Sequence, residues 1–497
     1  MTYRGDVKRI GIVIGATVLA IAAPISSSSA ASGLSSYRTQ PLNWHSCSVG
    51  QCASLRVPLD YTDLSRGDIT LAISRVQHSG PNFQGSIVIN PGGPGESGLD
   101  FAKYGAKYLA PDVAREFDFI GLDPRGVQNS APVTCMTPRQ TAAWLAMDSS
   151  PDTPKEVTSV MRAAGRISKG CLKHSPRIAP FVGTASAAQD LDILRSALGE
   201  EKLNWLGFSY GTSLGTAYLE AFPDHVGRFV LDGALDPALN SMQISDGQSA
   251  GFQRAFQNFA ADCSRRKTCT LGVTPAEITK KVNALLARLD RHPLRTDQGP
   301  PLTQSLGMGG MLTAMYSTDM WEPLGDAIAQ ALSGNGTGLM ELAWLGSEQT
   351  GPAKFTSNVQ SAYYAIDCWD MPAPPGADGL SAAARRWSAG APVPEFAKSM
   401  AWSNAPCTNW FAHDARGPAP ATSSTKAPIL EIGTRFDPAT PYEWSQALSS
   451  QLATSTLLTY EGNGHTAFGS GSRCIDDQVQ LYLLRGTLPP KGASCSA

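Results

Sequence analysis

The chain has 497 residues, of which 42% are hydrophobic and 16% are charged, and its formal net charge is −2. The hydrophobic fraction is large enough for a sizeable core and excludes general disorder, and the near-neutral charge argues against a nucleic-acid partner. The 48 glycines and 35 prolines predict many turns and loops.

The N-terminal segment has the pattern of an export signal. Basic residues precede an apolar run at 10–25, and a Ser/Ala-rich stretch follows at 26–32. This order predicts a signal peptide over residues 1–30 that is cleaved near Ala30, and therefore a secreted protein. An uncleaved membrane anchor is the weaker interpretation, because the run contains Pro24 and is shorter than the ~20 residues that a spanning helix needs. We therefore expect no stable membrane anchor.

Ten cysteines follow the predicted signal peptide, and an even number in an exported chain predicts disulfide bonds. The count alone permits about 945 complete pairings. Short loops favour two pairs, and the remaining six cysteines are then paired in chain order, which gives Cys47–Cys52, Cys263–Cys269, Cys135–Cys171, Cys368–Cys407 and Cys474–Cys495. A metal site is the weaker interpretation, because the chain has no C-x-x-C pair and its seven histidines are scattered. We expect no metal and no other cofactor.

Short apolar runs alternate with helical patterns between residues 42 and 237. This alternation is typical of a parallel sheet that is covered by helices on both faces. In chain order we expect strands at 86–90 and 117–122, a helix at 190–198, a strand at 202–206, a helix at 212–222 and a strand at 228–231. We assign this segment, 42–237, to the first part of an α/β core.

The middle segment, 238–422, has a mainly helical pattern. Thr274 and Glu277 fit a capping box with a proline at the first helical position, so a helix should begin there and end near Arg291. We interpret this segment as a helical cap that is inserted into the core.

The last segment, 423–497, returns to alternating strands and helices, with strands expected at 428–432 and 455–460 and a helix at 442–452. Because the pattern matches that of the first segment, we assign it to the C-terminal part of the same α/β core.

The sequence Gly-Phe-Ser-Tyr-Gly at 207–211 matches the motif G-x-S-x-G. The bare pattern is weak, but here it lies between a predicted strand and a predicted helix, which is where a nucleophile elbow must lie. Small flanking residues are needed because the turn is tight. Ser209 is therefore the candidate nucleophile, and a plain strand-to-helix turn is the alternative.

A glycine- and proline-rich loop, 90–95, directly follows the strand predicted at 86–90. Such a loop can bring backbone N–H groups beside a nucleophile, and Gly93 and Tyr210 are the candidate donors of an oxyanion hole. The alternative of a phosphate-binding loop is excluded because the Gly-Lys-Ser/Thr sequence is missing.

The candidate base is His465, which lies in a glycine-containing loop after a late strand, whereas His225 lies at a helix end and is interpreted as structural. The acid should precede the base, and Asp437 follows a strand at a suitable place. Asp232, at the end of an earlier strand, is the alternative acid. The order Ser209, Asp437, His465 is that of the α/β-hydrolases.

Taken together, these motifs resemble those of secreted tripeptidyl aminopeptidases, relatives of the prolyl aminopeptidases among the serine exopeptidases. The resemblance extends across most of the mature chain, and six segments carry it: N-P-G-G-P-G-E-S-G at 90–98, G-L-D-P-R-G at 121–126, G-F-S-Y-G-T at 207–212, V-L-D-G at 230–233, G-T-R-F-D-P-A-T-P at 433–441 and G-H-T-A-F at 464–468. The resemblance implies an α/β-hydrolase fold, a mostly parallel central sheet, an inserted helical cap and the triad Ser209, Asp437 and His465. Prolyl aminopeptidases usually carry His where Pro91 stands, so a strict proline preference is not implied.

An exopeptidase that acts at a peptide's N-terminus needs a buried anion for the substrate ammonium. The cap and the loop after the first strand offer five candidates, Glu96, Asp319, Glu322, Asp367 and Asp370, of which Glu96, Glu322 and Asp370 are preferred.

The function expected from the sequence is a secreted serine exopeptidase that acts on peptides through an acyl-enzyme and releases short peptides, tripeptides by the resemblance. The alternative is a secreted carboxylic ester hydrolase with the same triad. A binding protein without catalysis is a third hypothesis, which the intact Ser, Asp and His disfavour.

Overall fold

The structure is a computed structural model, and it describes residues 28–297 and 299–496. The predicted signal peptide lies almost entirely outside this part of the chain. A helix, α1 (Ser28–Arg38), precedes a sheet of ten strands. The strands are β1 (His45–Cys47), β2 (Gly50–Pro58), β3 (Asp68–Val76), β4 (Ser86–Asn90), β5 (Asp118–Leu122), β6 (Leu203–Phe208), β7 (Val226–Asp232), β10 (Ile429–Phe436), β11 (Ser455–Asn463) and β12 (Ser494–Ser496).

The strands lie in the order β1-β2-β3-β5-β4-β6-β7-β10-β11-β12. All pairs from β5 to β12 are parallel, whereas β1, β2 and β3 pair in the antiparallel sense and extend the sheet beyond β5. The predicted mostly parallel sheet is thus confirmed. The antiparallel edge was not predicted, because β2 alternates buried and exposed residues and lacks the wholly buried run of β4 and β5.

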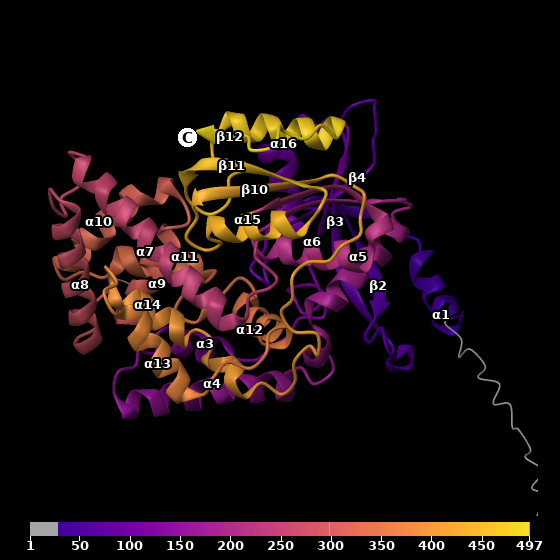
Figure 1. The fold of residues 1–497 in the computed structure, drawn as a ribbon. Coiled ribbons are helices and arrows are strands. Elements are labelled where there is room, and N and C mark those ends of the chain that lie inside the picture. The colour runs from indigo at the N-terminus through magenta and orange to yellow at the C-terminus, as the bar shows by residue number, and fades with distance from the viewer. Residues whose placement is uncertain (1–27, 298, 497) are drawn as a thin grey trace, which may run out of the picture.

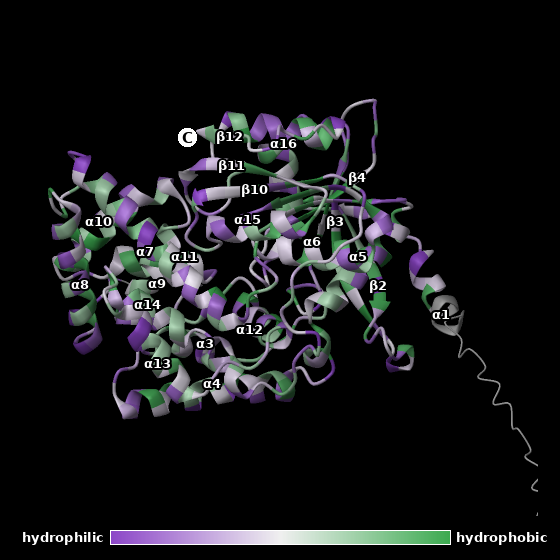
Figure 2. Cartoon of the chain, in the orientation of Figure 1, coloured by the Kyte–Doolittle hydropathy of each residue, from purple (hydrophilic) through white to green (hydrophobic). Residues whose placement is uncertain are grey.

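Helices cover both faces of the sheet (Figure 1). One face packs against α5 (Thr184–Ala197), α6 (Tyr210–Ala221) and α15 (Tyr442–Gln451), and the other against α2 (Leu99–Tyr104) and α16 (Arg473–Arg485). Buried apolar residues of the strands and of these helices form the core on each face, and the helices carry hydrophilic as well as hydrophobic residues (Figure 2). The parallel strands therefore end together at one edge, where loops can assemble a site.

The chain between β7 and β10 is mainly helical and has its own apolar core. Its helices are α7 (Ser241–Arg265), α8 (Pro275–Arg291), α9 (Gln304–Ala314), α10 (Trp321–Leu332), α11 (Thr337–Gly346), α12 (Val359–Asp370), α13 (Ala377–Ser388) and α14 (Pro394–Trp402), with a small hairpin of β8 (Gln349–Gly351) and β9 (Lys354–Phe355). The predicted helix from Pro275 to Arg291 is confirmed. Thr274 accepts the N–H of Glu277, but the Glu277 carboxylate accepts from Val273, so only half of the predicted capping box forms.

Two earlier helices, α3 (Pro138–Leu145) and α4 (Pro154–His174), also join this helical region. Val160 and Ala164 of α4 share a buried cluster with Leu380 of α13 and Ala401 of α14. The helical layer therefore includes residues that precede the boundary predicted at 237. The remaining domain boundaries stay a prediction.

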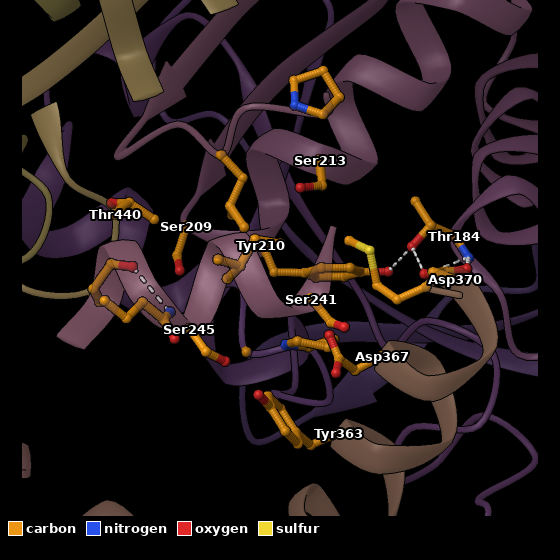
Figure 3. Close-up of a pocket in the computed structure, with 18 of the residues that line it drawn as sticks. Thr184, Ser209, Tyr210, Ser213, Ser241, Ser245, Tyr363, Asp367, Asp370 and Thr440 are labelled. Carbon is orange, nitrogen blue, oxygen red and sulfur yellow. Dashed lines mark hydrogen bonds between the residues drawn. The ribbon is translucent and has the colours of Figure 1, made fainter. Parts of the chain in front are cut away.

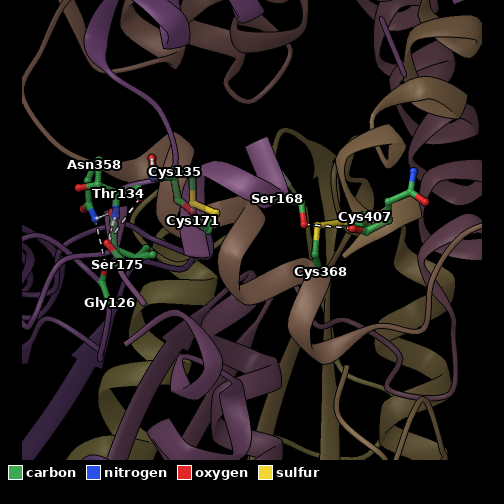
Figure 4. Close-up of a disulfide and its surroundings, with 12 residues drawn as sticks. Gly126, Thr134, Cys135, Ser168, Cys171, Ser175, Asn358, Cys368 and Cys407 are labelled. Atoms are coloured by element: carbon green, nitrogen blue, oxygen red, sulfur yellow. Dashed lines mark hydrogen bonds between the residues drawn. A yellow bond between two sulfur atoms is a disulfide. The ribbon is translucent and has the colours of Figure 1, made fainter. Parts of the chain in front are cut away.

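The ten cysteines form the five disulfides predicted from chain order. Two of them lie near each other beside α4 (Figure 4). Cys135–Cys171 joins the segment before α3 to α4, and Cys368–Cys407 joins α12 to the short helix at 405–409. Ser168 of α4 donates to the Asn409 carbonyl at 3.0 Å, and this hydrogen bond joins α4 to the short helix at 405–409. These links fix α12, whose last turns face the cavity described below.

The buried carboxyl group of Glu431 in β10 should make stability fall with rising pH. The residue is fully buried and accepts from Ser455 Oγ at 2.6 Å, while its Oε2 has no partner among the described residues. Burial raises the pKa of Glu431 to about 8, so between its unfolded pKa and that value the folded state holds an extra proton. Folding stability is therefore highest at low pH in this window and is lost as the pH rises through 8.

Glu431→Gln keeps the shape and removes the ionisation. As the pH rises from 5 to 8, we expect the variant to gain stability over the wild type by on the order of 3 kcal/mol, measured by urea unfolding at each pH. The exposed Glu341→Gln is the control and should follow the wild type. Parallel pH curves for Glu431→Gln and the wild type would contradict the prediction.

Candidate active site

Ser209 lies at the sharp turn between β6 and α6, as predicted. Its backbone has φ 53° and ψ −122°, a conformation that costs a non-glycine residue about 1–3 kcal/mol. Its N–H donates to the Asp232 carbonyl at 2.9 Å, and a Cβ atom at Gly207 would lie 2.5 Å from the Gly211 carbonyl oxygen. The tight turn thus needs the small residues of the motif, and it directs the Ser209 side chain into a cavity (Figure 3).

The glycine-rich loop after β4 lies directly against this turn. Asn90 Oδ1 accepts the Gly92 N–H at 3.0 Å, and a Cβ atom at Gly92 would lie 2.6 Å from the Phe208 carbonyl oxygen and 3.0 Å from Ser209 Cβ. Gly93, with φ +104°, lines the same cavity as Ser209 and Tyr210. The structure therefore brings both predicted oxyanion-hole residues to the wall that holds Ser209.

His465 and Asp437 form a hydrogen-bonded pair. Nδ1 of His465 lies 3.0 Å from both carboxylate oxygens of Asp437, which is fully buried. Burial alone lowers the pKa of His465, but the Asp437 carboxylate outweighs it and holds the pKa above its ordinary value. Such a pair suits an imidazole that must accept and hold a proton during a reaction.

Thr440 supports this pair and was missed by the sequence reasoning. Its N–H donates to Asp437 Oδ1 at 2.8 Å, and its Oγ1 lies 3.1 Å from Asp437 Oδ2 and 3.3 Å from His465 Nδ1. The one feature of the sequence that could have indicated Thr440 is its position three residues after Asp437, in the loop that follows β10.

Tyr316, at the end of α9, connects the helical region to His465. Its carbonyl accepts the His465 N–H at 2.8 Å, and the two rings meet edge to face with centroids 5.1 Å apart. No sequence motif marks this residue, because the two positions lie far apart in the chain.

Asp232, the alternative acid, has other partners. Its carboxylate accepts from the N–H groups of Ala467 and Phe468 at 2.8–3.1 Å, two and three residues after His465. The geometry at His465 thus favours Asp437 over Asp232 as the orienting acid.

A cavity of about 1040 Å³ lies between Ser209 and the helical region and contains several acidic side chains. Figure 3 shows Asp367 and Asp370, from the end of α12, across the cavity from Ser209. Burial raises the pKa of Asp370 to about 7 and that of Asp367 to about 6. Asp370 accepts from the N–H and Oγ1 of Thr184 at 2.9 and 2.5 Å.

Glu96 lines the same cavity close to the glycine-rich loop. Burial, together with the charge of Glu348, raises the pKa of Glu96 to about 7. The cavity thus holds at least four carboxyl groups, those of Glu96, Glu348, Asp367 and Asp370, which makes it suited to a cationic group.

Glu322 and Asp319 do not line this cavity, in contrast to the expectation from the sequence. Both are exposed, Asp319 in the short 3-10 helix at 318–320 and Glu322 in the first turn of α10. The helix buries Trp321 and Leu324 in the core of the helical region, and this directs Glu322 to the opposite, solvent-facing side. Among the preferred acids, Glu96 and Asp370 therefore reach the cavity and Glu322 does not.

Two features concern residues 28–297 and 299–496, the part of the chain that the structure describes. No helix in this part of the chain is long and apolar enough to span a bilayer. The same residues contain no group of three or more His, Cys, Asp or Glu side chains placed to hold a metal ion.

Comparison with known proteins places the chain among hydrolases. The profile of TAP-like proteins matches residues 391–495. Serine protease Hip1 of Mycobacterium tuberculosis is 34% identical over 92% of this chain and 91% of its own length. Carboxylesterase B of the same organism is 34% identical over 91% of this chain and 90% of its own length. A tripeptidyl aminopeptidase of Streptomyces coelicolor is 30% identical over 92% of this chain and 86% of its own length. The solved structure of a proline iminopeptidase of Mycobacterium smegmatis covers 87% of this chain and 98% of its own, with 14% sequence identity and a TM-score of 0.38.

Proposed function

The chain belongs to the tripeptidyl-aminopeptidase-like serine hydrolases of the α/β-hydrolase fold, and on that premise we propose that it is a secreted exopeptidase which removes tripeptides from the N-termini of peptides. The observation that carries this proposal is the pair of buried carboxyl groups, Asp367 and Asp370, in the cavity that also holds Ser209.

In the proposed reaction, Ser209 Oγ attacks the scissile carbonyl carbon while His465 takes the hydroxyl proton. Asp437 orients the imidazole and stabilises the imidazolium that forms. The N–H groups of Gly93 and Tyr210 stabilise the oxyanion, each by ~3 kcal/mol. His465 then gives its proton to the leaving amine, and a water molecule, activated by the same imidazole, hydrolyses the acyl-enzyme and regenerates Ser209.

Recognition of a free N-terminus requires an anion that a blocked peptide cannot satisfy. Asp367 fits this role, because it lines the cavity and its carboxylate has, within residues 28–297 and 299–496, a single polar neighbour, a disulfide sulfur at 4.0 Å that carries no proton to donate. An ammonium group beside Asp367 and Asp370 would replace the water lost on burial and hold both acids in their charged forms.

The separation between the acids and Ser209 supports a short released peptide. From the residue after Ser209, the Tyr210 side chain extends to Thr184 Oγ1 at 2.5 Å, and Thr184 in turn donates to Asp370. A tyrosine side chain and two hydrogen bonds span on the order of 10 Å. Three residues of extended peptide also span about 10 Å. Because this path is the greatest separation that the contacts allow, an N-terminus held at Asp370 would leave room for at most about three residues before Ser209.

The test is digestion of a peptide library with free and acetylated N-termini, read by mass spectrometry. We expect tripeptides from free N-termini and at least a tenfold lower rate on acetylated peptides, because a charge-assisted hydrogen bond contributes about 1.5–3 kcal/mol. Internal cleavage that tolerates acetylated N-termini would overturn the exopeptidase proposal.

Asp367→Asn should raise KM for free peptides by about tenfold or more, since the amide loses the charge that pairs with the ammonium. Its effect on a small neutral ester should be small. The exposed Glu322→Gln is the matched control and should behave as the wild type. Equal losses on peptide and ester would argue against a role of Asp367 in binding the N-terminus.

A carboxylic ester hydrolase is the second candidate, and the similarity to carboxylesterase B favours it. Both reactions proceed through an acyl-enzyme on the same serine, so the rates of peptide hydrolysis and ester hydrolysis must be compared to decide between them. Short acyl esters that are turned over far better than any free peptide would support the esterase.

Secretion is tested by N-terminal sequencing of the protein recovered from the culture medium. We expect the mature chain to begin close to Ala31, after removal of the predicted signal peptide.

A further inference from the structure

Asp232 lies at the junction of the two loops that carry Ser209 and His465. It is the last residue of β7, the strand between β6, which leads to Ser209, and β10, which leads to Asp437. Its main-chain carbonyl accepts the Ser209 N–H at 2.9 Å, and the following Gly233 donates to Ile432 of β10 at 3.0 Å. The backbone at this point is thus tied to the Ser209 turn on one side and to strand β10 on the other.

The Asp232 side chain holds the loop that follows His465. Its carboxylate accepts the Ala467 N–H at 3.0 and 3.1 Å and the Phe468 N–H at 2.8 Å, and the residue is fully buried. The preceding N–H, that of Thr466, donates to Asp437 at 3.1 Å. Three successive N–H groups therefore point to two carboxylates on adjacent strands.

This loop needs such support because its backbone is strained. Thr466 has φ +66°, a left-handed conformation that costs a non-glycine residue roughly 1–2 kcal/mol. A Cβ atom at Gly233 would lie 3.0 Å from Thr466 Cγ2 and 3.4 Å from His465 Cε1, so the loop also packs closely on β7. The Phe468 ring stacks in parallel on Phe208, with centroids 6.5 Å apart, which adds a contact with β6.

We propose that Asp232 is a positioning residue: it holds one loop by its carboxylate and the other by its carbonyl, and so fixes His465 relative to Ser209. The inference rests on the proposed roles of Ser209 and His465 and goes beyond them. Asp232 does not touch the substrate, and it accepts no proton from the reacting groups. A neutral amide at this position can accept N–H groups with only one oxygen, and its own NH₂ group faces the loop's donors.

Charge gives the position a second effect. The charged groups that face Asp232 are Asp437, which raises its pKa, and His465, which lowers it. The negative charge of Asp232 in turn raises the pKa of His465. Burial raises the pKa of Asp232 itself to about 7. Because Asp232 carries its charge only near and above pH 7, removing the charge should change the acidic limb of the kcat/KM profile in that pH range, an effect that a purely structural residue would not produce.

The experiment compares Asp232→Asn with the wild type and with Asp118→Asn. Asp118 is a matched control, because it is also a buried carboxylate that accepts a backbone N–H, from His78, but it lies at the opposite, amino end of its strand. We expect kcat for a small p-nitrophenyl ester to fall about 10- to 100-fold in Asp232→Asn with KM within twofold, and the acidic limb to shift. Asp118→Asn should keep the wild-type kcat and the wild-type acidic limb.

The small ester makes the result independent of peptide specificity. If the wild type cleaves the ester and not peptides, the exopeptidase proposal fails and the comparison at Asp232 still stands. Labelling of Ser209 by a fluorophosphonate counts the folded sites. Unchanged kcat and pH profile in Asp232→Asn, or equal losses in Asp118→Asn, would overturn the positioning role.

Amide hydrogen exchange tests the contacts of Asp232 in the wild-type protein, without any substitution. In the wild type, the amides of Ala467 and Phe468 should be protected at pH 8 and lose protection toward pH 6, beyond the intrinsic change in exchange rate, because Asp232 then takes up a proton. Amides in the buried strand β4 should not change. Equal behaviour of the loop and β4 would count against the proposal even if Asp232→Asn fails to fold.

Discussion

Replacing Ser209 with alanine should lower kcat by about 10⁴-fold or more on both peptide and ester substrates, because the acyl-enzyme can no longer form. KM should change little, since the cavity and its acids stay in place. The prediction rests on the strained turn that directs Ser209 into the cavity and on the loop of Gly92 and Gly93 packed against it. Initial rates and active-site labelling with a fluorophosphonate measure it.

Ser213→Ala is the matched control for this substitution. Ser213 lines the same cavity one turn further along α6, and its loss should leave kcat within a few-fold. His465→Ala should cost nearly as much as Ser209→Ala, and the double variant little more than either, because the residues of a triad act as a unit. Retained hydrolysis in Ser209→Ala would refute the triad and both enzyme candidates that use it.

Replacing Arg125 with methionine should destabilise the fold by about 3–5 kcal/mol, since it leaves the charge of Asp190 buried and unpaired. Arg125 and Asp190 are both fully buried and joined by two hydrogen bonds of 2.7 Å. The remaining guanidinium N–H groups donate at 3.0 Å to the carbonyls of Pro58, Leu59 and Phe181. The pair thus holds together the end of β2, the segment at Phe181 and helix α5.

Urea unfolding at neutral pH measures this loss. The double variant Arg125→Met/Asp190→Leu should recover much of the stability, because it removes both charges and not only one. Arg254→Met is the control: its ion pair with Glu443 is exposed, so its loss should cost less than about 1 kcal/mol. A loss of similar size at Arg125 and Arg254 would contradict the argument.

The parallel strands and the loops at their ends could be predicted from the sequence because their signals are local. Ser86–Asn90 contains an uninterrupted apolar run, Ile87–Ile89, that leads into a glycine- and proline-rich loop, and Gly207–Gly211 is a motif whose spacing itself requires a tight turn. The disulfides followed from chain order because each joins cysteines that are neighbours in the sequence. By contrast, β2 and β3 have an amphipathic pattern without a distinctive turn between them, and they were missed.

The contacts around His465 show where sequence reasoning ends. Thr440 and Tyr316 contact His465 from a loop and from the turn after α9, both distant from His465 in the chain, and no local sequence pattern encodes these contacts. Asp232 was identified as a candidate from the sequence, but only the fold gave it the N–H groups of Ala467 and Phe468 as partners.

By itself, then, the sequence determined the α/β-hydrolase core, the disulfides and the candidates Ser209, Asp437 and His465, because turns, strand runs and chain order are properties of neighbouring residues. Only the tertiary structure decided which acids face the cavity. Glu322 and Asp370 look alike in the sequence, but the packing of α10 turns the first to solvent, whereas α12 turns the second inward. The direction of a helical side chain depends on which face the helix buries, and that face is chosen by the rest of the fold.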